Sequence, residues 1–182
     1  ALPIYAIIHV LRCFDDGNVV HVDGSVDPVR DKEIIDTELQ LKDLETVENR
    51  IKRVEKIAQV GSDKNAKVEY QVLSAIKEAL LEGKNARSVE FDTKDEQTAA
   101  RNLFLLTSKP VLYVCNVDEN SAATGNEYVE RVREVVKDEG AEILVVAAQT
   151  EADIAELETY EERQEFLKDV GLEESGVNRL IK

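Results

Sequence analysis

The sequence predicts an α/β protein, in which a parallel sheet with covering helices is interrupted by an inserted hairpin of long helices. Apolar, β-branched segments alternate with helical segments in the last third of the chain, as they do in parallel sheets. Residues 28–105 instead have the apolar spacing of long amphipathic helices. At 182 residues, the chain is long enough for one good core plus such an insertion.

Charge and cysteine content restrict the class of protein. The net charge of −15 disfavours broad, non-specific binding to nucleic acid or anionic lipid, because that binding depends on neutralising phosphates, although a local basic patch is still possible. Cys13 and Cys115 lie far apart in the sequence and predict neither a zinc site nor a disulfide framework, which fits a reducing, intracellular compartment. No apolar run approaches the ~20 residues of a membrane span. No signal peptide is evident.

The first segment, residues 4–14, is predicted to be a strand because Ile, Val and Tyr dominate it. Residues 15–18 have turn composition, and residues 19–22 form a short extended segment that ends at Asp23-Gly24. The chain contains no Met and opens within this strand, so we expect it to be a piece of a longer protein.

The inserted region is predicted to form two long helices and a shorter third one. The first extends from Arg30 to about Gln59, where a Glu48–Lys52 pair has the favourable orientation. Ser62 or Asp63 could cap the second helix, which extends from about residue 65 to 81, and the short turn predicts antiparallel packing. A capping signature at residues 92–96 begins the third helix, which we expect over 93–106. The heptad positions of the first helix are Leu44, Val47, Ile51, Val54 and Ala58.

The α/β pattern resumes after this insertion. We expect strands at 110–116 and 143–147, separated by a helix over about 127–137 and followed by helices at 151–156 and 159–169. Three regions result: an α/β segment at 1–27, the helical insertion at 28–105, and the second α/β part at 106–182.

The strand at 110–116 ends in Asn116-Val117-Asp118-Glu119, at the edge where open α/β sheets bind ligands. GTP-binding proteins carry Asn-Lys-x-Asp there, and the Asp accepts two hydrogen bonds from guanine. Glu119 extends the carboxylate by one methylene and spoils that geometry, while Val117 would lie against the face of the base, where the stem of the Lys normally lies. The simpler interpretation, that Asn116 caps the strand and a loop begins, is the better one for this tetrapeptide alone.

The next strand ends in Ala147-Ala148-Gln149, at the spacing where nucleotide-binding proteins of this kind place a Ser-Ala-Lys/Gln loop that touches the base. A turn of small residues between strand and helix is the alternative. The signal is weak by itself and gains weight because it follows Asn-x-x-Glu.

Several segments together resemble the YchF/Obg-like ATPase family. The similarity covers nearly the whole chain from about residue 6, in the family's order. The segments are HVLRCF at 9–14, VHVDG at 20–24, DPVRDKEIIDTELQLKDLET at 27–46, LLTSKP at 105–110, EADIAEL at 151–157 and GLEESGVNR at 171–179.

This resemblance implies an Obg-type G domain of the P-loop NTPase class, with a coiled-coil insertion and a C-terminal TGS domain. It also implies hydrolysis of ATP in preference to GTP with Mg²⁺, association with the ribosome, and a cytoplasmic, non-membrane protein that we expect to be monomeric. By position, Asn116, Val117 and Glu119 would hold the adenine, and Ala147, Ala148 and Gln149 would close over it.

His21 matches the histidine proposed in that family to orient the attacking water. An imidazole could do so by hydrogen bonding, and a mobile segment would bring it in only when nucleotide is bound. A half-packed histidine at the edge of a short strand is the alternative, and the two are about equally supported. His9, within the first strand, is expected to be structural.

No glycine of the chain is followed by Lys-Ser or Lys-Thr, so no phosphate-binding loop is present. We expect that loop, the switch segments and the Mg²⁺ ligands upstream and the TGS domain downstream, and we expect the chain alone to be inactive.

A non-enzymatic coiled-coil adaptor is the alternative function. Its candidate binding surface is the cluster Arg50, Lys52, Arg53 and Lys56, which could contact ribosomal RNA or be one solvated helix face. An adaptor, however, has no need of strands ending in Asn-x-x-Glu and Ala-Ala-Gln.

Overall fold

The computed structural model describes residues 4–16, 25–60 and 63–181. They form two compact units. The sheet unit comprises residues 7–32 and 111–181, and the helical unit comprises residues 4–6 and 33–110, within the described ranges. The sequence predicts the limits of the helical insertion at 28 and 105.

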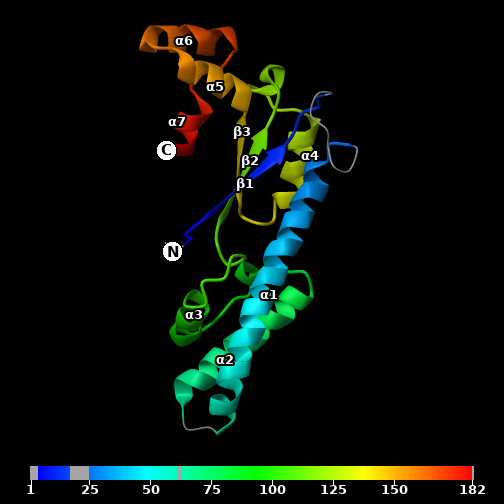
Figure 1. Ribbon diagram of the computed structural model, residues 1–182, viewed down its shortest axis with the longest axis vertical. Helices are drawn as coiled ribbons and strands as arrows, with labels where there is room; N and C mark the ends of the chain where they lie inside the picture. Colours follow the sequence, from blue (N-terminus) through cyan, green and yellow to red (C-terminus); the bar gives the residue numbers. More distant parts are fainter. Residues whose placement is uncertain (1–3, 17–24, 61–62, 182) are drawn as a thin grey trace. The chain divides into compact units, whose positions relative to one another are not determined.

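Three parallel strands form the sheet, in the order β1-β2-β3 (Figure 1). They are β1 (Ile7–Arg12), β2 (Val111–Asn116) and β3 (Glu142–Val146). Arg12 is in register with Asn116, and Asn116 with Val146, so all three strands end at one edge. The predicted α/β class with a parallel sheet is confirmed.

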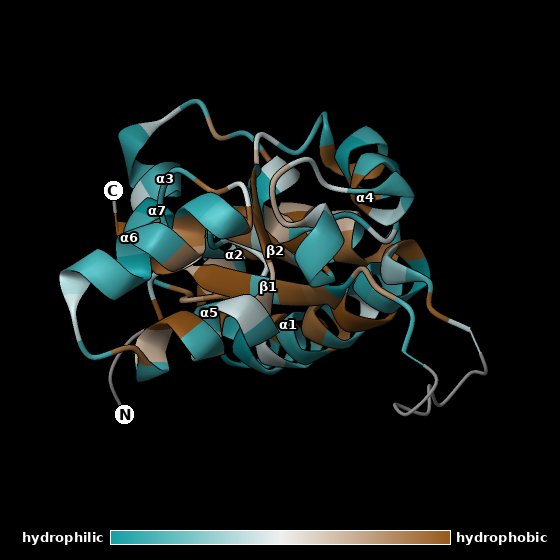
Figure 2. Ribbon diagram, turned by 90° about the horizontal axis from the view of Figure 1, so that it is seen from above, coloured by the Kyte–Doolittle hydropathy of each residue, from teal (hydrophilic) through white to brown (hydrophobic). Residues whose placement is uncertain are grey.

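Helix α4 (Glu127–Val136) covers one face of the sheet. Its apolar residues recur every three or four positions and pack on the strand residues that point to this face. Figure 2 shows the strands as hydrophobic and much of the surrounding helical surface as hydrophilic. The buried core of the sheet unit includes Leu11, Cys13, Tyr113, Cys115, Val129, Val132 and Val136.

The remaining elements of the sheet unit follow the ends of β2 and β3. A short 3₁₀ turn, η2 (Glu119–Ser121), follows β2, and α5 (Ala148–Glu156) follows β3 directly. Helix α6 (Tyr160–Asp169) begins with a capping box made by Thr159 and Glu162, and α7 (Gly176–Ile181) lies along β3.

Helix α1 (Pro28–Val60) begins in the sheet unit and continues into the helical unit. Asp27 caps it by accepting hydrogen bonds from the amides of Val29 and Arg30, and Pro28 occupies the first helical position, where no amide hydrogen is needed. Lys32 is buried in the sheet unit, with its ammonium 2.7 Å from Glu139. The first turns of α1 are therefore bound to the sheet.

Helix α2 (Lys64–Leu81) packs antiparallel to α1, as predicted, and Asp63 caps its amino end. Ion pairs link Arg50 to Glu69, and Glu48 to Lys77 at 2.8 Å; Glu48 thus pairs across the hairpin rather than with Lys52. The predicted heptad residues are buried or half-buried in the helical core, which also includes Val72, Leu73, Ile76, Leu80 and Leu105.

The third helix is shorter than predicted. The 3₁₀ turn η1 (Ala86–Ser88) precedes it, and α3 (Lys94–Arg101) begins with the expected Thr93–Glu96 capping box. It ends at Arg101 rather than at 106 because Phe104 adopts a positive φ of 53°, which is not a helical conformation. The amides that follow form hydrogen bonds outside the helix. The buried carboxylate of Asp43 in α1 accepts hydrogen bonds from the amides of Leu106 and Thr107, at 2.8 and 2.7 Å.

Among the residues described, no helix has both the length and the apolar content needed to cross a membrane.

Candidate functional site

The Asn116–Glu119 loop and the Ala147–Gln149 loop, which we expected to contact the nucleotide base, lie next to each other. The amide of Val117 donates to the carbonyl of Val146 at 2.8 Å, which extends the β2–β3 pairing by one bond beyond the strands. The Oδ1 atom of Asn116 accepts a hydrogen bond from the amide of Ala148 at 2.9 Å. The side chain of Asn116 therefore joins the end of β2 to the first turn of α5 and leaves its Nδ2 group to donate.

Asp118 and Glu119 have different surroundings. Asp118 caps η2, because its carboxylate accepts from the amide and the hydroxyl of Ser121 at 3.2 and 3.0 Å. Glu119 is exposed, and no group in the described part of the chain pairs with its carboxylate. Of the two acids, Glu119 is therefore the one able to accept hydrogen bonds from a ligand.

Val117 differs from our expectation. We expected its side chain to lie against the face of a base, but it is only 3% exposed and belongs to the core of the sheet unit. The reason is the strand geometry, since Val117 follows Tyr113 and Cys115 at the spacing that keeps it on the face covered by α4. Any contact of Val117 with a base is limited to that small exposed area and to its backbone.

The Ala147–Gln149 segment forms the start of α5. Ala147 is buried, whereas Ala148 and Gln149 are exposed. Ala147 occupies the N-cap position and has no side-chain oxygen to cap the helix, so the amide of Ala148 depends on Asn116. The side-chain amide of Gln149 donates to Asp153 at 3.0 Å.

Helix α4 binds the described residues on both sides of the segment that contains His21. Asn126, its N-cap, donates to the carbonyl of Cys13 at 2.7 Å, and Tyr128 donates to Asp15 at 2.8 Å. Arg131 donates to both carboxylate oxygens of Asp27 at 2.9 and 3.0 Å. His21 itself lies outside the described residues, so its assignment stays a prediction.

Two pKa shifts accompany these contacts. Burial opposes the ionisation of Asp27, but the hydrogen bond from Arg131 and the amides of Arg30 and Val29 outweigh it and lower the pKa of Asp27. The hydrogen bond to Asp15 raises the pKa of Tyr128, because ionising the phenol would place two negative charges together.

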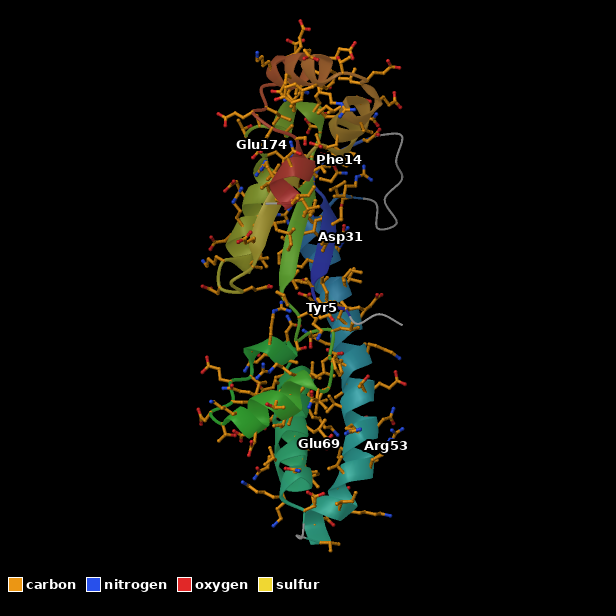
Figure 3. The ribbon with its side chains drawn as sticks, turned by 90° about the vertical axis from the view of Figure 1, so that its left-hand side faces the viewer. Tyr5, Phe14, Asp31, Arg53, Glu69 and Glu174 are labelled. Carbon is orange, nitrogen blue, oxygen red and sulfur yellow. The ribbon has the colours of Figure 1, made fainter. Side chains whose placement is uncertain are left out.

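The end of β1 is fixed by Arg12. Its guanidinium lies 4.8 Å from the ring centroid of Phe14 and donates to the carbonyls of Phe14 and Asp16; Figure 3 labels Phe14. His9, further back in β1, lies 5.6 Å from the ring of Tyr113, in keeping with a structural role.

Cys13 directly follows β1, Cys115 lies on the adjacent strand β2, and both are buried. The hydrogen bond to Cys115, together with burial, raises the pKa of Cys13 far above its ordinary value. Both side chains belong to the core of the sheet unit.

The described residues contain no group of three His, Cys, Asp or Glu side chains that could hold a metal ion. No step of the chemistry is assigned to a metal held by this part of the chain.

The residues that support the base loops and the His21 segment were not predicted from the sequence. Glu151 and Gly176 contact each other beside β3, and Tyr128 and Arg131 bind the chain before and after the His21 segment. The available sequence signals, an acid in a first helical turn and a glycine before a short helix, are too common to identify such contacts.

Comparisons with known proteins agree on one group of relatives. No protein-family model matches the chain. It is 52% identical over 179 residues to the ribosome-binding ATPase YchF of Bacillus subtilis, and 46% identical over 177 residues to that of Haemophilus ducreyi. Each alignment covers 97% of this chain and 48% of the relative, so the chain spans about half the length of these proteins.

A solved structure, that of the YchF GTPase of Schizosaccharomyces pombe, matches with a TM-score of 0.84 and 29% identity. The match covers 98% of this chain and 48% of that protein. The sequence resemblance is thus confirmed by identity, by order along the chain and by fold. The chain is therefore a homologue of the YchF proteins over nearly all of its residues and corresponds to about half of their length.

Proposed function

We propose that this chain is the base-recognition and helical part of a ribosome-associated ATPase of the YchF type, which binds and hydrolyses ATP in preference to GTP. The observation that carries the proposal is the hydrogen bond from the amide of Ala148 to Oδ1 of Asn116. It holds the two loops at the carboxyl edge of the sheet, where open α/β sheets bind ligands, in one arrangement without a ligand.

The base preference follows from the hydrogen-bonding groups at this edge. Adenine presents an acceptor at N7 and donor hydrogens at N6, which match the Nδ2 group of Asn116 and the carboxylate of Glu119. Guanine would require a carboxylate placed to take two parallel bonds from N1 and the exocyclic amine. The longer side chain of Glu119 moves the carboxylate out of that position. Losing a buried pair of hydrogen bonds to guanine costs several powers of ten in discrimination between the two bases.

The chemical step depends on groups outside the described residues. In the proposed mechanism, His21 orients the attacking water by a hydrogen bond, and Mg²⁺ and the phosphate loop are supplied by another part of the protein. The chain alone is therefore inactive in this account. ATP turnover by a pure preparation, abolished by His21→Ala, would contradict it.

The base reader is tested by Glu119→Asp in the full-length protein. Shortening the carboxylate restores the acid of the guanine reader, so we expect the ratio of ATP to GTP affinity to fall by at least about tenfold, measured by calorimetry. Glu165→Asp, at an exposed position of α6, is the matched control, because it shortens a carboxylate by the same methylene away from the base loops. An unchanged ratio in Glu119→Asp would remove Glu119 from the site.

The helical unit is the part that we assign to the ribosome. Acidic side chains outnumber basic ones about two to one in the sheet unit, whereas the two nearly balance in the helical unit. Arg50 is paired with Glu69, but Lys52, Arg53 and Lys56 are exposed (Figure 3 labels Arg53 and Glu69). Arg50 and Arg53 also line a hollow of about 340 Å³, together with Thr46, Asn49, Asn102 and Leu103.

Such a basic helix face fits the phosphate backbone of ribosomal RNA. Arg53→Glu combined with Lys56→Glu should weaken co-sedimentation with ribosomes and flatten its dependence on salt, whereas Lys168→Glu on α6 should not. A non-enzymatic adaptor remains the second candidate, because the same surface would serve it. Ribosome binding by a full-length protein with no affinity for ATP would favour that adaptor.

A further inference from the structure

The base loop at Ala147–Gln149 begins a helix that lacks a side-chain cap, so its position depends on contacts from other elements. One is the bond to Asn116 already described. The others come from the chain after α6, where α7 lies along β3 (Figure 1).

Glu151 makes the first of these contacts from within the opening turns of α5. Its Oε1 atom accepts a hydrogen bond from the amide of Gly176 at 2.6 Å, and its Oε2 atom lies 3.5 Å from the amide of Val177. The side chain is half-buried. A carboxylate that accepts backbone amides makes a stronger bond than a neutral acceptor, so Glu151 joins the start of α5 to the start of α7.

Gly176 provides the second contact, because its lack of a side chain lets the backbone of α7 approach β3 closely. It is buried, and a Cβ atom at this position would lie 2.6 Å from Cγ1 of Val146 and 3.1 Å from Oε1 of Glu151. The first distance is far shorter than carbon atoms allow. Glycine is required here because α7 approaches the end of β3 so closely.

The second contact lies at Val146, the residue that links the two base loops. Val146 is the last residue of β3, precedes Ala147, and accepts the amide of Val117 through its carbonyl. Displacing α7 would therefore disturb the start of α5 and the Asn116 loop together. Arg179 of α7 adds a longer hydrogen bond, 3.4 Å, to the carbonyl of Val145.

We infer that Glu151 and Gly176 are positioning residues for nucleotide binding, which hold the Ala147–Gln149 loop and the end of β3 in place for the base. They act through the loop and do not touch the nucleotide. The inference rests on the proposed function, since it names the support of the same site.

Glu151→Ala and Gly176→Ala in the full-length protein test this inference. Each should raise the KM and the Kd for ATP about tenfold while leaving kcat nearly unchanged, because the base loop and not the reacting phosphate is displaced. Glu151→Gln keeps an acceptor for the amide of Gly176, so its affinity should stay close to that of the unmodified protein. Glu156→Gln on α5 and Asn178→Ala on α7 are the matched controls.

A compensating pair makes the test specific. Val146→Ala removes the Cγ1 atom that a Cβ at position 176 would strike, so the double variant Val146→Ala/Gly176→Ala should regain most of the ATP affinity lost in Gly176→Ala. Unaltered ATP affinity in both Glu151→Ala and Gly176→Ala, with an unmodified protein that binds ATP, would overturn the inference alone. An unmodified protein that does not bind ATP would overturn the proposed function.

Discussion

Asn116 is held by the fold before any ligand arrives. Its Oδ1 atom is bound to the amide of Ala148, and its backbone carbonyl accepts the amide of Cys13 at 2.7 Å. Both bonds fix the direction of its remaining donor group, which lowers the ordering cost of binding. Its role at the base is a prediction from the sequence. It could not show the bond to Ala148, because that bond depends on the register of two strands separated by α4.

At the residue scale, Asp27 gives a prediction about pH. Its carboxylate is stabilised in the folded state by Arg131 and by the amides of Arg30 and Val29, which lower its pKa from the ordinary 3.8. A depressed carboxyl pKa contributes stability above the unfolded-state pKa, and this contribution is lost as the pH falls through the folded-state pKa. Asp27→Asn should therefore destabilise the protein at pH 7, and the difference should shrink below about pH 4.

Urea unfolding of both proteins between pH 7 and pH 3 measures this difference. Asp169→Asn, at the exposed end of α6, is the control and should show no such trend. A difference between Asp27→Asn and the unmodified protein that stays constant or grows on acidification would show that the pair with Arg131 does not stabilise the fold.

At the scale of elements, α4 shows what periodicity can and cannot predict. Its apolar spacing predicted a helix over 127–137, and the structure has it at Glu127–Val136 with Val129, Val132 and Val136 buried. The polar face gave no signal, yet Tyr128 and Arg131 bind Asp15 and Asp27 there. Contacts between residues about a hundred positions apart leave no local pattern in the sequence.

Asn126 provides the prediction for this element. It caps α4 by accepting the amide of Val129 at 3.2 Å, and it donates to the carbonyl of Cys13 at 2.7 Å. Asn126→Ala removes both bonds and should cost about 2 kcal/mol of unfolding free energy. Asn126→Asp keeps the cap and loses the donor, so it should cost less. Equal stability of Asn126→Ala and the unmodified protein would contradict this role.

The helical insertion was predicted well where local rules apply. The heptad residues, the Asp63 cap and the Thr93–Glu96 capping box all match the sequence patterns. The predicted end of the third helix was wrong because a tertiary contact determines where this helix ends. The carboxylate of Asp43, buried in α1, accepts hydrogen bonds from the amides of Leu106 and Thr107. In a helix that continued through 106, the amide of Leu106 would instead donate to a carbonyl of the same helix.

At the scale of the whole molecule, the chain spans 48% of the length of its Bacillus subtilis relative. The fold class, the parallel strands and the family were predictable, because β-branched runs, helical apolar spacing and matching segments can be recognised in the sequence. The burial of Val117 was not, since which face of a strand is covered depends on the helix that packs there. The supports of the base loop, Glu151 and Gly176, became visible only through distances.

We propose that the edge formed by Asn116, Glu119 and Ala147–Gln149 selects adenine over guanine. Calorimetric titration of the full-length protein with ATP and with GTP, under identical magnesium and salt concentrations, measures this selection. We predict that ATP binds at least about tenfold more tightly than GTP. A clear preference for GTP would contradict the assignment of Glu119 and the account built on it.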